Sequence, residues 1–191
     1  MTTTIATPQT YSPAEYLALE IKAVTRNEYR NGAIIPMTGG TTTHNEIIGA
    51  MTVLLRLGVR GKKLQVFVTD QRLWIPEHQV YTYPDVMVVP RPIALQEGRK
   101  DTVTEPILIV EVLSNSTKNY DRGEKFADYR TIPSFEEYLL IDQTKYHVEH
   151  YGKQSAHQWL LTEHHQPQDR IMLSSIGVEF TLADLYADVE F

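Results

Sequence analysis

Residues 106–113 read Pro-Ile-Leu-Ile-Val-Glu-Val-Leu, an almost continuous aliphatic run with Glu111 in its middle. An apolar run of this length is typical of a strand that is covered on both faces of a sheet. A carboxylate placed there costs several kcal/mol unless it is paired, protonated or bound to a cation. The stretch therefore predicts a central strand. Glu111 either has a compensating partner, such as an ion pair, or reaches solvent at the strand end.

A second apolar stretch, residues 83–89, carries an acid at its start. It reads Tyr-Pro-Asp-Val-Met-Val-Val, so a proline begins the strand and Asp85 lies at its first turn-side position, directly before the apolar residues. A Pro-Asp dipeptide alone is common in turns, and the signal is the combination of two acids on two core strands joined by one loop. Together with Glu111, Asp85 would offer hard oxygen ligands of the kind that suit Mg²⁺, with waters and a substrate phosphate completing an octahedron.

Capping patterns and one tight turn organise the first third of the chain. Ser-Pro-Ala-Glu at 12–15 predicts a short helix that runs to about residue 20. Asn-Gly at 31–32 lies between two β-type runs and predicts a type I′ hairpin turn. Thr-His-Asn-Glu at 43–46 repeats the capping pattern, and apolar residues at helical spacing predict a longer helix to about residue 57.

Short β-rich runs dominate the rest of the chain. We expect a central sheet from the runs at 64–69, 72–76, 85–89 and 107–113. Further along, the pattern predicts a helix over 120–129, a strand at 137–141, a peripheral hairpin over 145–161 and a short helix that starts at 181. This mixture of helices and strands predicts an α/β (α+β) fold.

Composition restricts the chemistry. The 191 residues include no cysteine, which excludes thiolate nucleophiles and leaves oxygen or imidazole ligands for any metal. We expect a cytoplasmic protein with no membrane segment, because the longest apolar stretch is short and interrupted by Glu111. A net charge of −6 argues against a protein that coats nucleic acid, so a nuclease would need metal ions or a local basic patch. The basic clusters at 56–63 and 91–100 are more typical of solvated faces and loops.

The segment after Glu111 carries a second pair of charges. Asp121 and Lys125 lie four residues apart, on one face of the expected helix. A surface ion pair of this spacing contributes only a few tenths of a kcal/mol. The alternative is that Lys125 reaches back to the strand ends, where it could orient or activate an attacking water.

These motifs together resemble the Uma family, whose members are described as "putative restriction endonucleases", over roughly residues 12–142. The resemblance rests on Glu28, Asn31-Gly32, His44, Pro84-Asp85, Glu111-Val112-Leu113-Ser114, Asp121-Arg122-Gly123-Glu124-Lys125, Glu137-Tyr138 and Ile141-Asp142. That family belongs to the PD-(D/E)XK nuclease superfamily. The resemblance implies a restriction-endonuclease-like fold, a mixed β-sheet core flanked by helices with a peripheral N-terminal hairpin.

The resemblance also implies roles for individual residues. Asp85 and Glu111 would be the metal ligands, and Leu113 stands where the superfamily motif has its lysine. Lys125 would take over the role of that lysine, with Lys118 as a weaker substitute. Glu28 resembles an additional acid supplied by the N-terminal region, and Asp121 is a further candidate. His44 resembles a recurring family position, although a histidine at a helix start is often only solvent-facing.

We accordingly expect one domain over 1–191, with an N-terminal helix and hairpin at 12–37, a catalytic core at 43–142 and a C-terminal hairpin and helix at 145–191. The expected activity is a Mg²⁺-dependent endonuclease, with Mn²⁺ as a substitute, that hydrolyses phosphodiester bonds of nucleic acid. We expect DNA as the substrate, and RNA stays open as the alternative. A homodimer would suit the cleavage of two strands.

Two other functions stay open. One is a catalytically inactive module of the same fold that binds nucleic acid or a protein. The other is a serine hydrolase that uses Ser114 and His44, although no nucleophile-elbow sequence surrounds Ser114. His164-His165 lacks sequence neighbours that could complete a metal site, so we interpret it as a loop. Asp70 is at most a weak candidate for the cleft.

Overall fold

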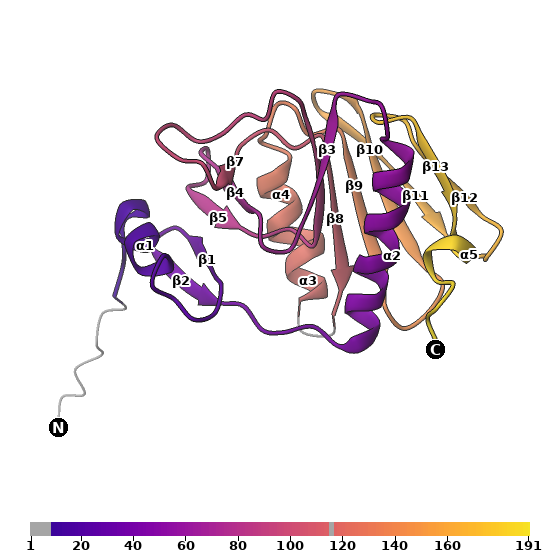
Figure 1. The fold of residues 1–191 in the computed structure, drawn as a ribbon, viewed down its shortest axis with the longest axis horizontal. Helices are drawn as coiled ribbons and strands as arrows, with labels where there is room; N and C mark the ends of the chain where they lie inside the picture. Colours follow the sequence, from indigo (N-terminus) through magenta and orange to yellow (C-terminus); the bar gives the residue numbers. More distant parts are fainter. Residues whose placement is uncertain (1–8, 115–116) are drawn as a thin grey trace.

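The computed structural model describes residues 9–114 and 117–191 and is built on a six-stranded mixed sheet with the strand order β11-β10-β9-β8-β6-β3 (Figure 1). The strand from the aliphatic run, β8, is central: it pairs in parallel with β9 and antiparallel with β6. The bounds are β3 Leu64–Val68, β6 Val86–Pro90, β8 Leu108–Leu113, β9 Glu137–Asp142, β10 Val148–Ser155 and β11 Gln158–His164. The expected hairpin over 145–161 is confirmed as β10 and β11, which extend this sheet.

A second sheet has five strands in the order β2-β1-β5-β4-β7. Its strands are β1 Asn27–Arg30, β2 Ala33–Pro36, β4 Arg72–Ile75, β5 Val80–Thr82 and β7 Thr102–Val103. The placement of residues 72–76 in the central sheet was therefore wrong, because β4 pairs with β5 and β7. The apolar pattern identifies a strand but does not encode its partners, and the chain leaves the main sheet at a turn where Thr69 has a φ of 25°.

The predicted N-terminal helix and hairpin turn are confirmed. Helix α1 (Pro13–Glu20) starts with a capping box in which Ser12 and Glu15 bond each other's backbone. The turn between β1 and β2 places Asn31 at a φ of 48° and Gly32 at a φ of 93°, as a type I′ turn requires. Tyr16 of α1 stacks on Tyr29 of β1, which fastens the helix to the second sheet.

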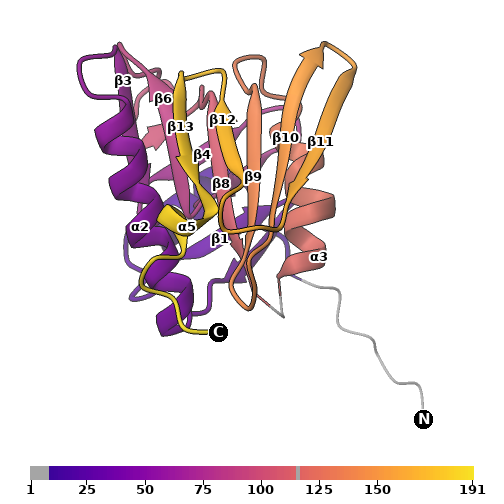
Figure 2. The same cartoon turned by 90° about the vertical axis from the view of Figure 1, so that its right-hand side faces the viewer.

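Helices cover the two faces of the main sheet. Helix α2 (Thr42–Gly58) lies on one face, together with the hairpin β12 (Arg170–Leu173) and β13 (Val178–Thr181) and with α5 (Leu182–Leu185), all on the near side in Figure 2. The helical segment formed by α3 (Lys118–Tyr120), the π-helical turn η1 (Asp121–Lys125) and α4 (Phe126–Tyr129) covers the other face with the second sheet. The N-cap of α2 is Thr41 rather than Thr43, because the Thr41 hydroxyl accepts from the His44 amide. The β12–β13 hairpin was not predicted.

The alternation of β8 decides where its acid points. Val110 and Val112 pack into the core under α2, whereas Ile109 and Leu113 pack into the core under α4. Because successive side chains point to opposite faces of a strand, Glu111 faces the α3–η1–α4 segment.

Among the residues that the structure describes, no helix is both long and apolar enough to cross a membrane.

A buried acidic cluster around Lys125

Asp85 and Glu111 meet at the same end of two adjacent strands. The antiparallel register pairs Val86 of β6 with Val110 of β8, which places Asp85 opposite Glu111. The Asp85 carboxylate accepts the Val112 amide through Oδ2 at 2.8 Å, and the Asp85 amide lies 3.5 Å from Oε2 of Glu111. The expected convergence of these two acids is present.

Lys125 occupies the centre of the cluster. Its Nζ lies 3.1 Å from Oε1 of Glu111, 3.2 Å from Oδ1 of Asp121 and 3.7 Å from Oε1 of Glu28. Asp121 is 2% exposed and Lys125 is 8% exposed, so the surface-pair alternative for these two residues is excluded. The turn η1 carries both side chains inward, and π-helical turns of this kind are frequent at functional sites.

The position that the motif lysine would occupy belongs to the core. Leu113 is 5% exposed and packs with the side chains beneath α4, on the same side of β8 as Glu111. Lys118, the other candidate, is exposed and lines the cleft, and it takes part in none of the ion pairs found between described residues. The structure therefore places Lys125, not Lys118, on Glu111.

Glu28 joins the cluster from β1. The Thr82 hydroxyl donates to its Oε1, and the Tyr120 hydroxyl donates to its Oε2 at 3.1 Å. These contacts fix the carboxylate beside Lys125.

His44 approaches from the opposite side, at the start of α2. Its Nε2 lies 3.3 Å from Oδ2 of Asp85. Burial lowers the pKa of the imidazole, but the hydrogen bond and charge of Asp85 outweigh burial and raise the pKa above its usual value. Gly40 packs against this ring, since a Cβ there would lie 2.5 Å from its Nδ1. The imidazole is therefore held on Asp85 and is not the solvent-facing histidine of the alternative interpretation.

The surroundings of Glu111 strongly raise the pKa of its carboxyl group. Burial and then the neighbouring Asp85 and Asp121 raise the pKa of Glu111 to about 8, against the opposing effects of Lys125 and of the Tyr129 hydroxyl, which donates to Oε1 at 2.7 Å. Burial also disfavours the charged form of Lys125, but the surrounding carboxylates hold its pKa well above the usual range. The cluster therefore contains an ammonium and an excess of acid groups.

A cleft of about 830 Å³ opens onto this cluster. Its lining includes five carboxyl groups, those of Glu28, Asp85, Glu111, Asp121 and Asp142, together with the buried ammonium of Lys125. Oxygen donors with excess negative charge fit a hard divalent cation, which would neutralise that charge.

The remaining sequence candidates lie elsewhere. Asp70 is exposed and pairs with Arg26 at 3.4 Å. The hydroxyl of Ser114 lies 2.8 Å from that of Thr117, while His44 is engaged with Asp85, so the geometry does not favour a serine hydrolase.

A family model described as "Putative restriction endonuclease", Uma2, matches residues 13–184. The chain belongs to the Uma2 family. This match covers all the residues of the acidic cluster, and the class of activity that it supports is that of a nuclease.

Relatives of this Uma2 chain resemble it over most of their length. "Uncharacterized protein sll1609" of Synechocystis sp. is 45% identical over 159 residues, which are 83% of this chain and 90% of that protein. "Uncharacterized protein slr1290" of the same organism is 36% identical over 182 residues, 94% of this chain and 93% of that protein. A crystal structure described as "a putative nuclease belonging to DUF820" from Anabaena variabilis aligns with a TM-score of 0.72 at 18% identity, over 93% of this chain and 98% of that one. The structural likeness confirms the expected fold class.

Two contributors to this Uma2 site escaped the sequence analysis. Tyr129 was not among the candidate site residues, yet its hydroxyl donates a hydrogen bond to Glu111. Tyr120 bonds Glu28 and receives a hydrogen bond from Arg30 at 3.0 Å. The available signal was helical spacing, because Tyr129 follows Lys125 by one helical turn and shares its face.

Proposed function

We propose that this Uma2 protein is a Mg²⁺-dependent endonuclease that hydrolyses phosphodiester bonds of DNA, with Asp85 and Glu111 as metal ligands and Lys125 as the catalytic cation. The observation that carries the proposal is the position of the Lys125 ammonium, 3.1 Å from the acid of one strand, at the end where the neighbouring strand presents Asp85. The nuclease character of the family supports the same class of reaction.

Each residue has a separate task in this proposal. A Mg²⁺ ion bound between Asp85 and Glu111 would supply Lewis-acid polarisation of a phosphate oxygen and a bound water of lowered pKa. Lys125 orients the attacking water and offsets negative charge on the phosphorane. Mn²⁺ prefers the same oxygen ligands and is expected to substitute for Mg²⁺.

The surrounding side chains act as positioning residues. Asp121 and Glu28 hold the Lys125 ammonium from two further directions, and Tyr129 fixes the Oε1 atom of Glu111. His44 holds Asp85 from the side of α2. Since a displacement of about 1 Å can cost a hundredfold in rate, these contacts matter for the reaction even though none touches the substrate.

The cleft also carries basic side chains that would contact the phosphates of a nucleic acid. Lys118, Arg122 and Lys145 line it along with the acids, and Arg122 is also paired with Glu149. Lysine and arginine contacts to phosphates supply sequence-independent affinity for nucleic acid. The basic clusters at 56–63 and 91–100 are not part of this lining.

A cleavage assay with matched acid variants tests the proposal. Supercoiled plasmid DNA and single-stranded RNA are incubated with the protein in Mg²⁺, Mn²⁺ or EDTA. We expect metal-dependent nicking of DNA that Asp85→Asn abolishes and that Asp70→Asn, an exposed acid outside the cleft, leaves unchanged. If the wild type cleaves neither nucleic acid and Asp85→Asn behaves identically, the endonuclease proposal fails and the inactive binding module replaces it.

Cleavage of both DNA strands by a chain with one such cleft calls for two copies that are related by two-fold symmetry. We therefore propose that the protein acts as a homodimer. Sedimentation with and without a DNA duplex tests this, since a protein that stays monomeric on DNA while making double-strand breaks contradicts it.

A further inference from the structure

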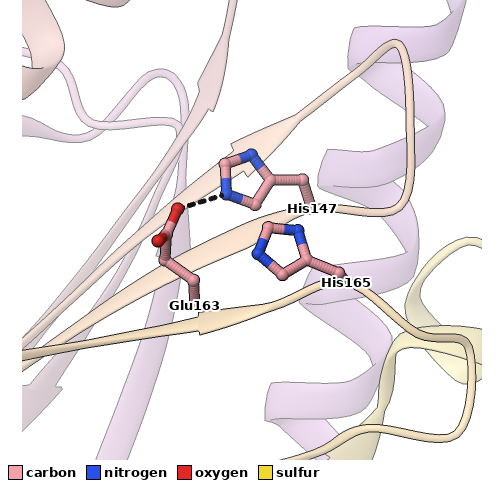
Figure 3. Close-up of side chains that lie close together, drawn as sticks. All are labelled: His147, Glu163 and His165. Carbon is pink, nitrogen blue, oxygen red and sulfur yellow. Dashed lines mark hydrogen bonds and ion pairs between the residues drawn. The ribbon is translucent and has the colours of Figure 1, made fainter.

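A second cluster of ligand-type side chains lies outside the acidic cleft, on the β10–β11 hairpin. Of the residues that the structure describes, His147, Glu163 and His165 form the one group in which three potential ligand atoms all lie within 4.8 Å of one another. The Nε2 atom of His147 is 3.0 Å from Oε1 of Glu163. The rings of His147 and His165 stack with centroids 4.7 Å apart and planes 8° apart, and Figure 3 shows both rings beside the Glu163 carboxylate.

Strand geometry explains why these three residues converge. The antiparallel register pairs Val148 with His164, so His147 lies opposite His165 across the ladder. Glu163 precedes His165 by two residues and therefore points to the same face of the sheet. The interpretation of His164-His165 as a loop was wrong for His164, which ends β11, and is confirmed for His165, which follows the strand. The neighbours of His165 come from the strand register, which the sequence does not show.

The backbone around the cluster is held in place before any ion binds. The carbonyl of His147 accepts hydrogen bonds from the Asp142 amide and from the Tyr186 hydroxyl, both at 3.0 Å. The amide of His165 donates to Oδ2 of Asp169 at 2.8 Å. An ion would therefore meet a largely preformed set of ligands, which lowers the ordering cost of binding.

We propose that His147, Glu163 and His165 bind a divalent transition-metal ion of the Zn²⁺ class. Two imidazoles and one carboxylate favour Zn²⁺ over Mg²⁺, which prefers oxygen ligands in an octahedron. A three-ligand set leaves a fourth tetrahedral position for water. The Glu163 side chain is 51% exposed and that of His147 only 10%, so the ion enters from solvent and binds against a buried wall.

The proposed ion would join two parts of the fold. Glu163 belongs to β11 and His147 immediately precedes β10, while His165 begins the connection to β12. Its binding would therefore fasten that connection to the edge of the main sheet. The site is independent of the nuclease proposal, because none of the described residues that line the acidic cleft belongs to it.

Zn²⁺ titration of the full-length, metal-stripped protein tests the proposal, with excess Mg²⁺ present to occupy hard oxygen sites. We expect calorimetry to detect one Zn²⁺ per chain and Zn²⁺ to raise the Tm. His165→Ala and Glu163→Gln, both at exposed positions, should weaken binding by more than about tenfold, since losing even an outer-shell partner of a metal costs about 10- to 100-fold. His157→Ala, an exposed histidine in the turn between β10 and β11, is the matched control and should bind as the wild type does.

Three results would overturn the assignment. The first is a wild-type protein that takes up no Zn²⁺ in excess Mg²⁺. The second is an affinity for Zn²⁺ that is the same in His165→Ala and Glu163→Gln as in the wild type. The third is loss of Zn²⁺ uptake in Glu111→Gln but not in His165→Ala, which would place the ion in the acidic cleft. Zn²⁺ binding and the change in Tm can be measured even if the protein does not cleave DNA, so a failure of the nuclease proposal does not affect this test.

Discussion

Replacing Glu111 by glutamine is expected to stabilise the metal-free protein at alkaline pH while abolishing cleavage. In the wild type, burial together with Asp85 and Asp121 raises the pKa of this carboxyl from 4.5 to about 8. Glutamine has nearly the same shape and its carbonyl can still accept from Lys125 and Tyr129, but it never ionises. The substitution therefore removes the unfavourable charge and leaves the fold otherwise unchanged.

The magnitude and its sign follow from the pKa of Glu111. Each pKa unit is worth about 1.4 kcal/mol, so a rise of the pKa from 4.5 to about 8 lowers the free energy of unfolding by roughly 5 kcal/mol when the carboxyl is fully ionised. The folded state binds more protons than the unfolded state across this interval, so stability falls as pH rises from 4.5 to 8. The glutamine amide makes less favourable hydrogen bonds than the carboxyl, which offsets part of this difference. We therefore expect Glu111→Gln to raise the free energy of unfolding over that of the wild type by about 2 to 5 kcal/mol at pH 8 and above, and by little at pH 4.5.

Urea denaturation in EDTA over this pH range is the assay, and Glu137→Gln is the control of opposite sign. Burial raises the pKa of Glu137, but bonds from His150 and Ser175 outweigh burial and lower it. The stabilisation from Glu137 is therefore present above its unfolded pKa and is lost as pH falls through its folded pKa. Glu137→Gln should consequently destabilise the protein at neutral and alkaline pH, where Glu111→Gln stabilises it.

Two outcomes would refute the reasoning about Glu111. One is a Glu111→Gln protein that is less stable than the wild type at alkaline pH, and the other is a stability difference that does not change with pH. Either would mean that Glu111 is an ordinary ionised partner of Lys125. Added Mg²⁺ should stabilise the wild type by RT ln(1 + [Mg²⁺]/Kd) and leave Glu111→Gln almost unaffected, which connects the same acid to the proposed metal site.

Three further substitutions probe neighbouring parts of the cluster. Lys125→Met should abolish cleavage and destabilise the protein by about 3 to 5 kcal/mol at neutral pH in urea denaturation, because it leaves buried carboxylates without their cation; equal stability to wild type would contradict this. Tyr129→Phe should cost about 1 to 2 kcal/mol and reduce kcat, since it removes a buried hydrogen bond; unchanged stability and kcat would speak against that bond. Gly40→Ala should displace His44 and reduce cleavage without a large loss of Tm. The control Gly39→Ala, whose Cβ would have no atom within 4 Å, should match the wild type. Equal cleavage by the two variants would exclude the close packing of Gly40 on the His44 ring.

Local patterns predicted the elements well where one short segment carries the whole signal. The capping box at Ser12, the Asn31-Gly32 turn and the aliphatic run of β8 each fix their structure through neighbouring residues, and each is found in the structure. The pairing of strands is different because it depends on contacts between distant segments. The assignment of β4 to the second sheet and the β12–β13 hairpin against α2 were accordingly not foreseen.

The same distinction applies to the site. Asp85 and Glu111 could be selected because a carboxylate in an apolar strand is conspicuous by itself. Tyr129 could not, since a tyrosine on a helix face is usually only a packing residue, and its bond to Glu111 depends on how the helix docks on the sheet. His147 became a candidate ligand only through the register of β10 and β11.

The geometry of the site explains why Lys125 of η1, and not a lysine at position 113 of β8, can supply the ammonium. The position of an ammonium beside Glu111 matters for the chemistry, whereas the element that supplies it does not. Leu113 and Lys125 lie on the same side of β8, so a lysine at either position would point toward the same carboxylate. A lysine from η1 leaves position 113 free to carry a leucine that packs with Phe126, and it also brings Asp121 to hold the ammonium from the same turn. One residue therefore packs in the core beneath α4, and another places the positive charge beside Glu111. In the motif arrangement a lysine at position 113 would supply the charge, and the core would lose the leucine.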